Sequence, residues 1–310
     1  MSANSITTQR PGIPPIAGIG LGILAISTAS ILVRYAQASG ASSLTIAALR
    51  LVIASVILLP IALVRSRAEL ATITMQEWLI ALASGAFLGA HFATWITSLQ
   101  YTSVTSSAVL VTFSPLFVAI GSALFLKERL SRLALGGILL AILGGIVISV
   151  GDASQSVVYA SNPLLGNVLA LIGAVSIAPH FLIGRRLRRK LSLLAYISVV
   201  YSAAALVLCV AVALTSSSFI GFDPDGYMYV VLLALLPQLV GHTSFNWSLG
   251  YLPAAYATIP AMAEPIGSTI LAMALLSESM TILKLVGAVL TLAGIAIMMV
   301  GRTKTDTMSA

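Results

Sequence analysis

Ten long stretches of apolar residues limit what this chain can fold into more than any other feature. A bilayer core is about 30 Å thick, and a helix needs about 20 apolar residues to cross it. The stretches cover residues 14–34, 43–64, 77–98, 103–126, 132–151, 163–184, 191–214, 227–249, 254–276 and 281–301. They are too long and unbroken for the strands of a membrane barrel, which span about 10 residues. The sequence therefore predicts an all-α polytopic membrane protein with ten transmembrane helices.

Charged residues are scarce, which fits a chain that lies mostly in lipid. Of the 310 residues, 59% are hydrophobic and 8% are charged, whereas soluble domains have about 25% charged residues. The first apolar stretch lacks a clear small-residue cleavage site and is preceded by one arginine, Arg10. We therefore interpret it as the first membrane span and not as a removable signal peptide. Cys209 is the only cysteine, which excludes an intramolecular disulfide.

The net charge of +7 is distributed unevenly between the loops. The basic residues on the same side of the membrane as Arg10 are Arg65, Arg67, Lys127, Arg129, Arg132, Arg185, Arg186, Arg188, Arg189, Lys190, Arg302 and Lys304. The opposite loops carry Asp152, Asp223, Asp225 and Glu278, with Arg34 and Lys284 at their margins. Because cytoplasmic loops are enriched in Lys and Arg, both termini are predicted to be cytoplasmic. We interpret the basic cluster at 185–190 as a topology signal, in place of a nucleic-acid or lipid-headgroup site.

The second half of the sequence repeats the first at an offset of 150 residues. Ser114-Pro115 aligns with Glu264-Pro265, and Glu128 aligns with Glu278. Further matched pairs are Ser98 and Ser248, Leu99 and Leu249, Tyr101 and Tyr251, Leu126 and Leu276, Ser131 and Thr281, Gly137 and Gly287, and Gly144 and Gly294. The chain is therefore predicted to consist of two repeats, 1–155 and 156–310, with five spans each.

An odd number of spans in each repeat means that the second repeat enters the membrane upside down. The loops agree, because Lys127-Glu128-Arg129 is a basic, cytoplasmic sequence and its counterpart Ser277-Glu278-Ser279 has no base. Inverted repeats are typical of secondary transporters, whose substrate site lies near the bilayer midplane between the repeats. We therefore expect alternating access through a central cavity.

The matched region also carries a family resemblance. Two segments resemble the paired domains of the drug/metabolite transporter superfamily, EamA type: 98–148 (SLQYTSVTSSAVLVTFSPLFVAIGSALFLKERLSRLALGGILLAILGGIVI) and 248–299. The residues that match the family's proline, glutamate and glycine pattern are Pro115, Glu128, Gly137, Pro265, Glu278 and Gly287. Within the superfamily the chain is similar to amino-acid and metabolite exporters, including the YddG type. The resemblance implies a central cavity lined by helices one, three, four, six, eight and nine, and outward movement of small metabolites.

Glu264 is the deepest acidic residue, near the middle of the ninth span and directly before Pro265. Proline kinks a helix and frees backbone carbonyls, so Pro260 and Pro265 predict an irregular segment beside a cavity. A carboxylate at this depth can hold a substrate ammonium group or carry a proton, or it can brace the kink. Its repeat counterpart is Ser114, and we expect the two to face each other. The first repeat then supplies a mainly neutral wall and the second the ionisable group.

All three histidines, His91, His180 and His242, fall within expected spans. His242 is the strongest candidate for substrate binding, because Gln238, His242 and Asn246 form a stripe with a spacing of four residues on one helix face. His180 lies next to Pro179 in the sixth span, and a helix-to-helix hydrogen bond is the alternative role for each histidine. No close His, Cys and Asp spacing points to a metal site.

Aromatic residues near these groups bear on substrate choice. We expect Trp95 to line the cavity together with Gln238, His242 and Asn246. An aromatic wall suits apolar or aromatic side chains and also cations. Tyr101 and Tyr251 fit either the cavity or an interfacial position. Arg50 lies within the second span, where it can pair with an acid or snorkel outward, and we favour a structural role for it.

These features predict a secondary transporter in a bacterial inner membrane that exports small metabolites, with amino acids, including aromatic and apolar ones, as the favoured class. Its expected partners are a small-molecule substrate and the lipid bilayer, with protons as a candidate coupling ion and no cofactor or nucleic acid. The alternative is a broad-specificity exporter of drugs or organic cations. An enzyme is disfavoured, because no motif fixes a serine near His91 and no Walker loop is present. A channel is disfavoured by the inverted repeat and the prolines in spans four, six, eight and nine.

Overall fold

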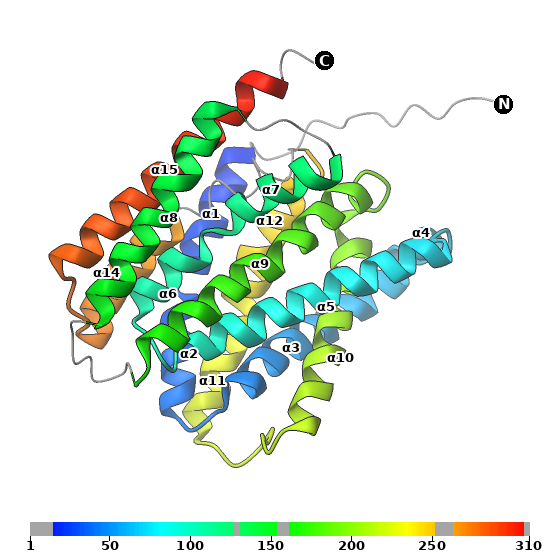
Figure 1. Ribbon diagram of the computed structural model, residues 1–310. Helices are drawn as coiled ribbons and strands as arrows, with labels where there is room; N and C mark the ends of the chain where they lie inside the picture. Colours follow the sequence, from blue (N-terminus) through cyan, green and yellow to red (C-terminus); the bar gives the residue numbers. More distant parts are fainter. Residues whose placement is uncertain (1–14, 127–130, 154–160, 252–262, 307–310) are drawn as a thin grey trace.

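Helices account for all the regular structure in the computed structural model, which describes residues 15–126, 131–153, 161–251 and 263–306 (Figure 1). The first half comprises α1 (Pro15–Ser27), α2 (Ala29–Ala38), α3 (Ser43–Arg65), α4 (Arg67–Leu70), α5 (Met75–Ser98), α6 (Val104–Val111), α7 (Ser114–Leu126) and α8 (Arg132–Ala153). The second half comprises α9 (Pro163–Leu187), α10 (Leu193–Leu214), α11 (Pro224–Leu233), the π-helix η1 (Ala234–His242), α12 (Thr243–Ser248), α14 (Glu264–Leu276) and α15 (Ile282–Asp306).

The prediction of ten spans is confirmed. In the described part of the chain, 7 helical segments have the length and apolar composition needed to cross a membrane. Three shorter apolar helices, Arg132–Ile148, Glu264–Leu276 and Ile282–Met298, correspond to spans five, nine and ten. Large apolar side chains such as Leu24, Val64 and Leu139 face outward, as expected for a protein surrounded by lipid.

Side-chain caps define where several spans begin. Ser42 accepts a hydrogen bond from the Thr45 amide at the start of α3, and Ser192 does the same for the Ala195 amide at the start of α10. Such caps satisfy backbone amides that have no partner within the helix. The polar residues that punctuate the apolar stretches therefore fix the helix boundaries.

Two spans are interrupted near their middle. The fourth span breaks after Val111 and resumes as α7 at Ser114, directly before Pro115. The eighth span changes from α-helix to the π-helix η1, which contains Pro237. Proline cannot donate a backbone hydrogen bond and its ring clashes with the preceding turn. In the ninth span the described helix starts at Glu264, with Pro265 in its first turn, while Pro260 lies outside the described residues.

The two halves pack with an approximate two-fold relation. The second and seventh spans, α3 and α10, pack against each other, and so do the fifth and tenth, α8 and α15 (Figure 1). The third span of each half packs against the first span of the other, α5 on α9 and η1 on α1. Exchanging the halves therefore reproduces the same set of contacts.

A glycine seam between α8 and α15 shows that the second repeat is inverted. A Cβ atom placed on Gly137 would lie 2.5 Å from the Gly294 carbonyl, and one placed on Gly144 would lie 2.7 Å from the Gly287 carbonyl. Because 137 meets 294 while 144 meets 287, the helices run antiparallel. Gly137 thus faces Gly294, the repeat counterpart of Gly144, and Gly144 faces Gly287, the repeat counterpart of Gly137. Two-fold symmetry requires this exchange. This confirms the prediction of inverted five-helix repeats.

Some sequence-based expectations fall outside the described residues. The predicted boundary between the repeats, at 155 and 156, lies there, as do Lys127, Glu128 and Arg129 in the first-repeat loop. The proposed division into 1–155 and 156–310 therefore stays a prediction.

Candidate functional site

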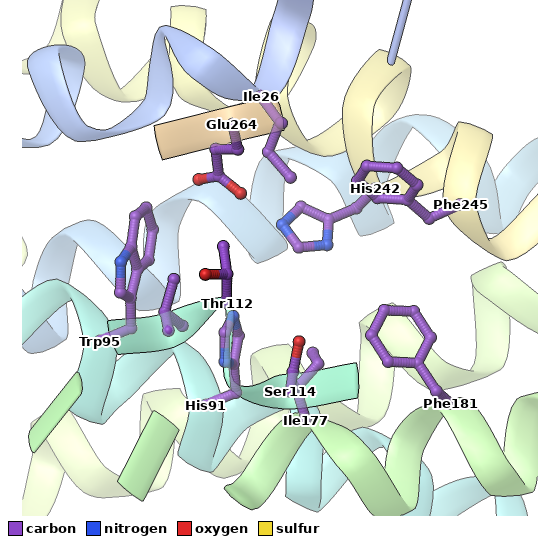
Figure 2. Close-up of a pocket in the computed structure, with 11 residues that line it drawn as sticks. Ile26, His91, Trp95, Thr112, Ser114, Ile177, Phe181, His242, Phe245 and Glu264 are labelled. Carbon is purple, nitrogen blue, oxygen red and sulfur yellow. The ribbon is translucent and has the colours of Figure 1, made fainter. Parts of the chain in front are cut away.

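A small cavity lies between the two repeats, with a volume of about 40 Å³. Its lining residues are Ile26, His91, Trp95, Val111, Thr112, Ser114, Ile177, Phe181, His242, Phe245 and Glu264 (Figure 2). They come from spans one, three, four, six, eight and nine, the set that the family resemblance implied. A buried water needs about 10–15 Å³ of such volume, so the cavity has room for a few waters. A larger solute requires the surrounding helices to move apart.

The two residues at equivalent repeat positions, Ser114 and Glu264, line this cavity from opposite sides (Figure 2). Each is the first residue of a half-span, α7 and α14 respectively, because a proline follows it. Glu264 is 6% exposed. Its position at a helix N-terminus favours a negative charge there. The broken spans thus bring one hydroxyl and one carboxylate to the centre of the molecule.

Two histidines from different repeats meet at the cavity. The ring centroids of His91 and His242 are 6.3 Å apart, although the sequence offset between them gives no reason to pair them. His91 Nδ1 lies 3.0 Å from the Gly173 carbonyl oxygen. Since a carbonyl only accepts, we assign the proton to Nδ1, which leaves Nε2 as an acceptor. Both histidines were predicted to bind substrate, and that role stays a prediction.

Trp95 supplies an aromatic wall and an open donor. Its ring stacks on His91 with centroids 6.1 Å apart and planes 4° apart. The indole Nε1 is buried and has no hydrogen-bond partner among the described residues. A buried polar group without a partner is costly. On the other walls Phe181 and Phe245 are apolar, so the cavity combines few polar groups with an aromatic surface.

Gln238 and Asn246 do not line the cavity, although both were predicted to. Gln238 is fully buried and its Oε1 accepts from Arg50 Nη2 at 2.9 Å. Asn246 Nδ2 donates to the Tyr201 hydroxyl at 3.3 Å and to the His242 carbonyl at 3.0 Å. Each side chain is instead held by a partner outside the cavity lining, Arg50 for Gln238 and Tyr201 for Asn246. Of the predicted stripe, only His242 reaches the cavity.

His180 also lies away from the cavity lining. It is 1% exposed, and its Nδ1 is 2.9 Å from the Ser84 hydroxyl. Ser84 in turn lies 3.1 Å from the Tyr196 hydroxyl. This network joins α5, α9 and α10. Its contacts correspond to the alternative role considered for this histidine, a hydrogen bond between helices.

Arg50 is the residue whose importance the sequence did not reveal. The suggestion that it snorkels outward is wrong, because the side chain is fully buried. Its guanidinium carbon lies 4.1 Å from the centroid of the Phe92 ring, and Phe92 contacts His242 with ring centroids 4.9 Å apart. Arg50 also interacts electrostatically with Glu264. The signal available in the sequence was a lone arginine inside an apolar span, which is by default a functional hypothesis.

Arg50 and Glu264 carry opposite charges in the interior but do not contact each other directly. No nitrogen of Arg50 is within 4.0 Å of an oxygen of Glu264. Arg50 Nε and Nη1 have no hydrogen-bond partner among the described residues. A cation and an anion that share a low-dielectric interior attract each other over such separations.

No group of three or more His, Cys, Asp and Glu residues that could hold a metal occurs in the described ranges.

An all-helical bundle of two inverted repeats, with ionisable groups around a central cavity, defines a membrane transporter. Residues 15–150 and 164–300 each match the EamA-like transporter family. The chain therefore belongs to this family, which is part of the drug/metabolite transporter superfamily.

Relatives of similar sequence agree with this assignment. An uncharacterized transporter of Archaeoglobus fulgidus is 28% identical over 64% of this chain and 68% of its own length. The uncharacterized transporter YetK of Bacillus subtilis is 26% identical over 67% of this chain and 63% of its own length. A protein of known crystal structure aligns with a TM-score of 0.65 and 18% identity, covering 95% of this chain and 99% of that one. At that identity the likeness shows the fold alone.

Proposed function

We propose that this transporter exports amino acids, including aromatic and apolar ones, by alternating access through the central cavity. The observation that supports this is the placement of one carboxylate, two imidazoles and one unpaired indole N–H around a cavity with apolar walls. An amino acid presents an ammonium group, a carboxylate and a side chain. The cavity offers a complementary group for each.

Glu264 is the group that would receive the ammonium. It is the only acidic side chain in the cavity lining of the described residues, and a charge-assisted hydrogen bond to it is stronger than a neutral one. The substrate carboxylate would take the Trp95 N–H and the Ser114 hydroxyl. Arg50, behind Phe92, adds a positive potential to that region. Phe181 and Phe245 would face the substrate side chain.

We further propose that the termini lie in the cytoplasm and that the protein resides in a plasma membrane. The basic loops support the orientation, and the start of α1 lies at the same end of the bundle as the end of α15 (Figure 1). The relatives in Bacillus subtilis support a bacterial membrane of this type. Export then means movement from the basic-loop side to the other.

Transport by purified protein in liposomes tests this proposal. A panel of labelled amino acids, supplied with and without a pH gradient, should show saturable transport that unlabelled amino acids compete for. Labelled organic cations serve as the second panel. Saturable transport of the cations without competition by any amino acid would overturn the proposed substrate class.

A broad-specificity exporter of organic cations is the second candidate. Glu264 and Trp95 favour it, because a carboxylate beside an aromatic face is a general cation site. The two candidates differ in the need for a substrate carboxylate. Amino-acid amides, which lack that charge, should compete poorly for an amino-acid exporter and well for a cation exporter.

A further inference from the structure

A second cluster of buried charge lies away from the cavity. It contains Arg34, Glu278 and Lys284, which are 8%, 9% and 1% exposed. Arg34 belongs to α2, Glu278 to the connection between α14 and α15, and Lys284 to the first turns of α15. Charges are costly to bury unless they are paired and hydrogen-bonded. The cavity chemistry described above uses none of these three residues.

The cluster ties the second repeat to the start of α6 in the first repeat. The Val104 amide donates to both oxygens of the Glu278 carboxylate, at 3.0 and 3.1 Å. Lys284 Nζ donates to the Ser103 hydroxyl at 3.2 Å. Ser103 is the N-cap of α6. Glu278 therefore acts as the anion at the N-terminus of a helix from the other repeat, where the helix dipole favours it.

Arg34 completes the cluster from α2. Its Nη2 donates to the Thr102 carbonyl at 2.7 Å and lies 3.7 Å from Glu278 Oε1. The helices α2, α6 and α14 contact one another in pairs. We refer to Arg34, Ser103, Val104, Glu278 and Lys284 as the Glu278 cluster.

The backbone just before Glu278 is strained. Ser277 has φ 54° and ψ 29°, and it is the only non-glycine residue with positive φ in the described ranges. A left-handed conformation is unfavourable for a residue with a side chain, and it persists where surrounding contacts hold it. It turns the chain at the end of α14 so that the Glu278 carboxylate meets α6.

The Glu278 cluster and the cavity lie at opposite ends of the same two half-spans. α14 begins at Glu264 in the cavity lining and ends just before Glu278, and α6 begins at Val104 and ends at the lining residue Val111. Any movement that separates α6 from α14 at this end must break the cluster. The hydrogen bonds there are buried, so breaking them has a substantial energetic cost.

We propose that the Glu278 cluster is a gate that closes one mouth of the cavity, and that Glu278 leaves the α6 N-terminus when this mouth opens. The predicted topology makes it the outer mouth. The proposal rests on the transporter fold and not on the identity of the substrate.

The contact between Lys190 and Glu77 also joins the two halves, but its side chains are 45% and 24% exposed. Exposed pairs of this kind contribute little, which makes Glu77 a suitable control.

Accessibility of the cavity to a thiol reagent tests the gate. The reporter is Ile177→Cys in a Cys209→Ala background, labelled with a membrane-impermeant maleimide in right-side-out and inside-out vesicles. Glu278→Gln keeps the shape of the side chain and removes its charge. We expect it to raise the labelling rate from one face about fivefold or more, as the closed state loses about 1 kcal/mol. Glu77→Gln should leave the rate unchanged.

A second variant removes the donor without touching any charge. Val104 is the first residue of α6, a position where proline is tolerated because its amide has no partner within the helix. Ser103 before it has φ −67° and ψ 155°, the conformation that a residue before proline prefers. Val104→Pro should therefore keep the helix, delete the hydrogen bond to Glu278 and raise the labelling rate as Glu278→Gln does. It also preserves the test if Glu278→Gln fails to reach the membrane.

The possible outcomes test the gate proposal and the predicted membrane orientation separately. Faster labelling from the outer face supports both the gate and the predicted orientation. Faster labelling from the inner face supports the gate and overturns the orientation. If both variants are folded and neither labels faster from either face, Glu278 and Val104 do not close the cavity and the proposal is wrong.

Discussion

Ser114 and Glu264 occupy equivalent positions in the two repeats and line one cavity from opposite sides. The symmetry of the backbone is thus combined with an asymmetry of chemistry, a hydroxyl in one repeat and a carboxylate in the other. Each residue begins a half-span and is followed directly by a proline. The ionisable group therefore belongs to the second repeat, at the point where the two repeats meet.

Glu264→Gln tests the role of that carboxylate. The variant keeps the shape and hydrogen-bonding capacity but cannot carry a negative charge. We expect the KM for amino acids to rise about tenfold or more, because hydrogen bonds to charged groups contribute about 1.5–3 kcal/mol. Ser114→Ala is the matched change in the other repeat and should have a smaller effect.

Other results for Glu264→Gln have definite meanings. Unchanged substrate binding with loss of the response to a pH gradient would make Glu264 a proton site instead of an ammonium site. If both binding and pH response equal those of the wild type, Glu264 braces the break in the ninth span and has no direct role in transport.

Arg50 should be needed for stability as well as transport. Arg50→Met removes the cation while filling much of the volume, which leaves Gln238 Oε1 without its donor. A buried acceptor left without a partner costs about 1–3 kcal/mol. We expect a clear fall in the melting temperature of the purified protein. Arg65→Met, at an exposed position at the end of α3, should have little effect.

The double variant Arg50→Met, Glu264→Gln separates charge balance from packing. If the two groups are coupled electrostatically, the double variant should be more stable than Arg50→Met alone. Transport should stay defective, because the carboxylate is missing. A double variant whose loss equals the sum of the single losses would show that the two residues act independently.

Trp95 has two features that can serve the substrate, the indole N–H donor and the aromatic ring. Trp95→Phe and Trp95→Ala test them separately. Trp95→Phe keeps an aromatic ring next to His91 and removes the indole N–H, so we expect a higher KM with a normal amount of protein in the membrane. Trp95→Ala and His242→Ala remove the side chains and should reduce transport further. Wild-type kinetics in all three would assign these residues a structural role, and protein amount is measured in each case.

Two neighbouring glycines give opposite expectations for one substitution. A Cβ on Gly137 would lie 2.4 Å from the Met298 amide nitrogen, while one on Gly136 would meet nothing within 4 Å. Gly137→Ala should therefore destabilise the protein by about 1–3 kcal/mol through overpacking. Gly136→Ala should be neutral or slightly stabilising, since alanine has the better helix propensity. Thermal unfolding in detergent measures both, and equal effects would argue against the glycine seam.

Single cysteines test the predicted orientation. In a Cys209→Ala background, Ser216→Cys, exposed between α10 and α11, should react with an impermeant reagent outside intact cells. Ala71→Cys, exposed between α4 and α5, should react only after permeabilisation. The predicted outer loop from Asp152 to Asn162, mostly outside the described residues, gives a further site at Ser154. The reverse pattern would invert the topology and the direction of export with it.

The sequence by itself determined the architecture. Apolar stretches of membrane length must form helices, because every backbone N–H and C=O group in the lipid core has to be hydrogen-bonded within the protein. Because each repeat has an odd number of spans, the second repeat must be inverted relative to the first. The contact between Gly137 and Gly294 agrees with this inversion. Ser114, Glu264, His91, Trp95 and His242 were also predicted for the site, since polar groups at that depth need a protein or aqueous environment.

Only the tertiary structure decided which polar residues share a space. Gln238 and Asn246 do not line the cavity because Arg50 and Tyr201, which lie far away in the chain, hydrogen-bond their side chains. His91 and His242 came together through packing between repeats. Snorkelling was one of two options that the sequence left open for Arg50, yet its side chain is buried against Phe92 and Gln238. The partners of a buried charge lie far away in the chain, so its role depends on contacts that only the folded protein creates.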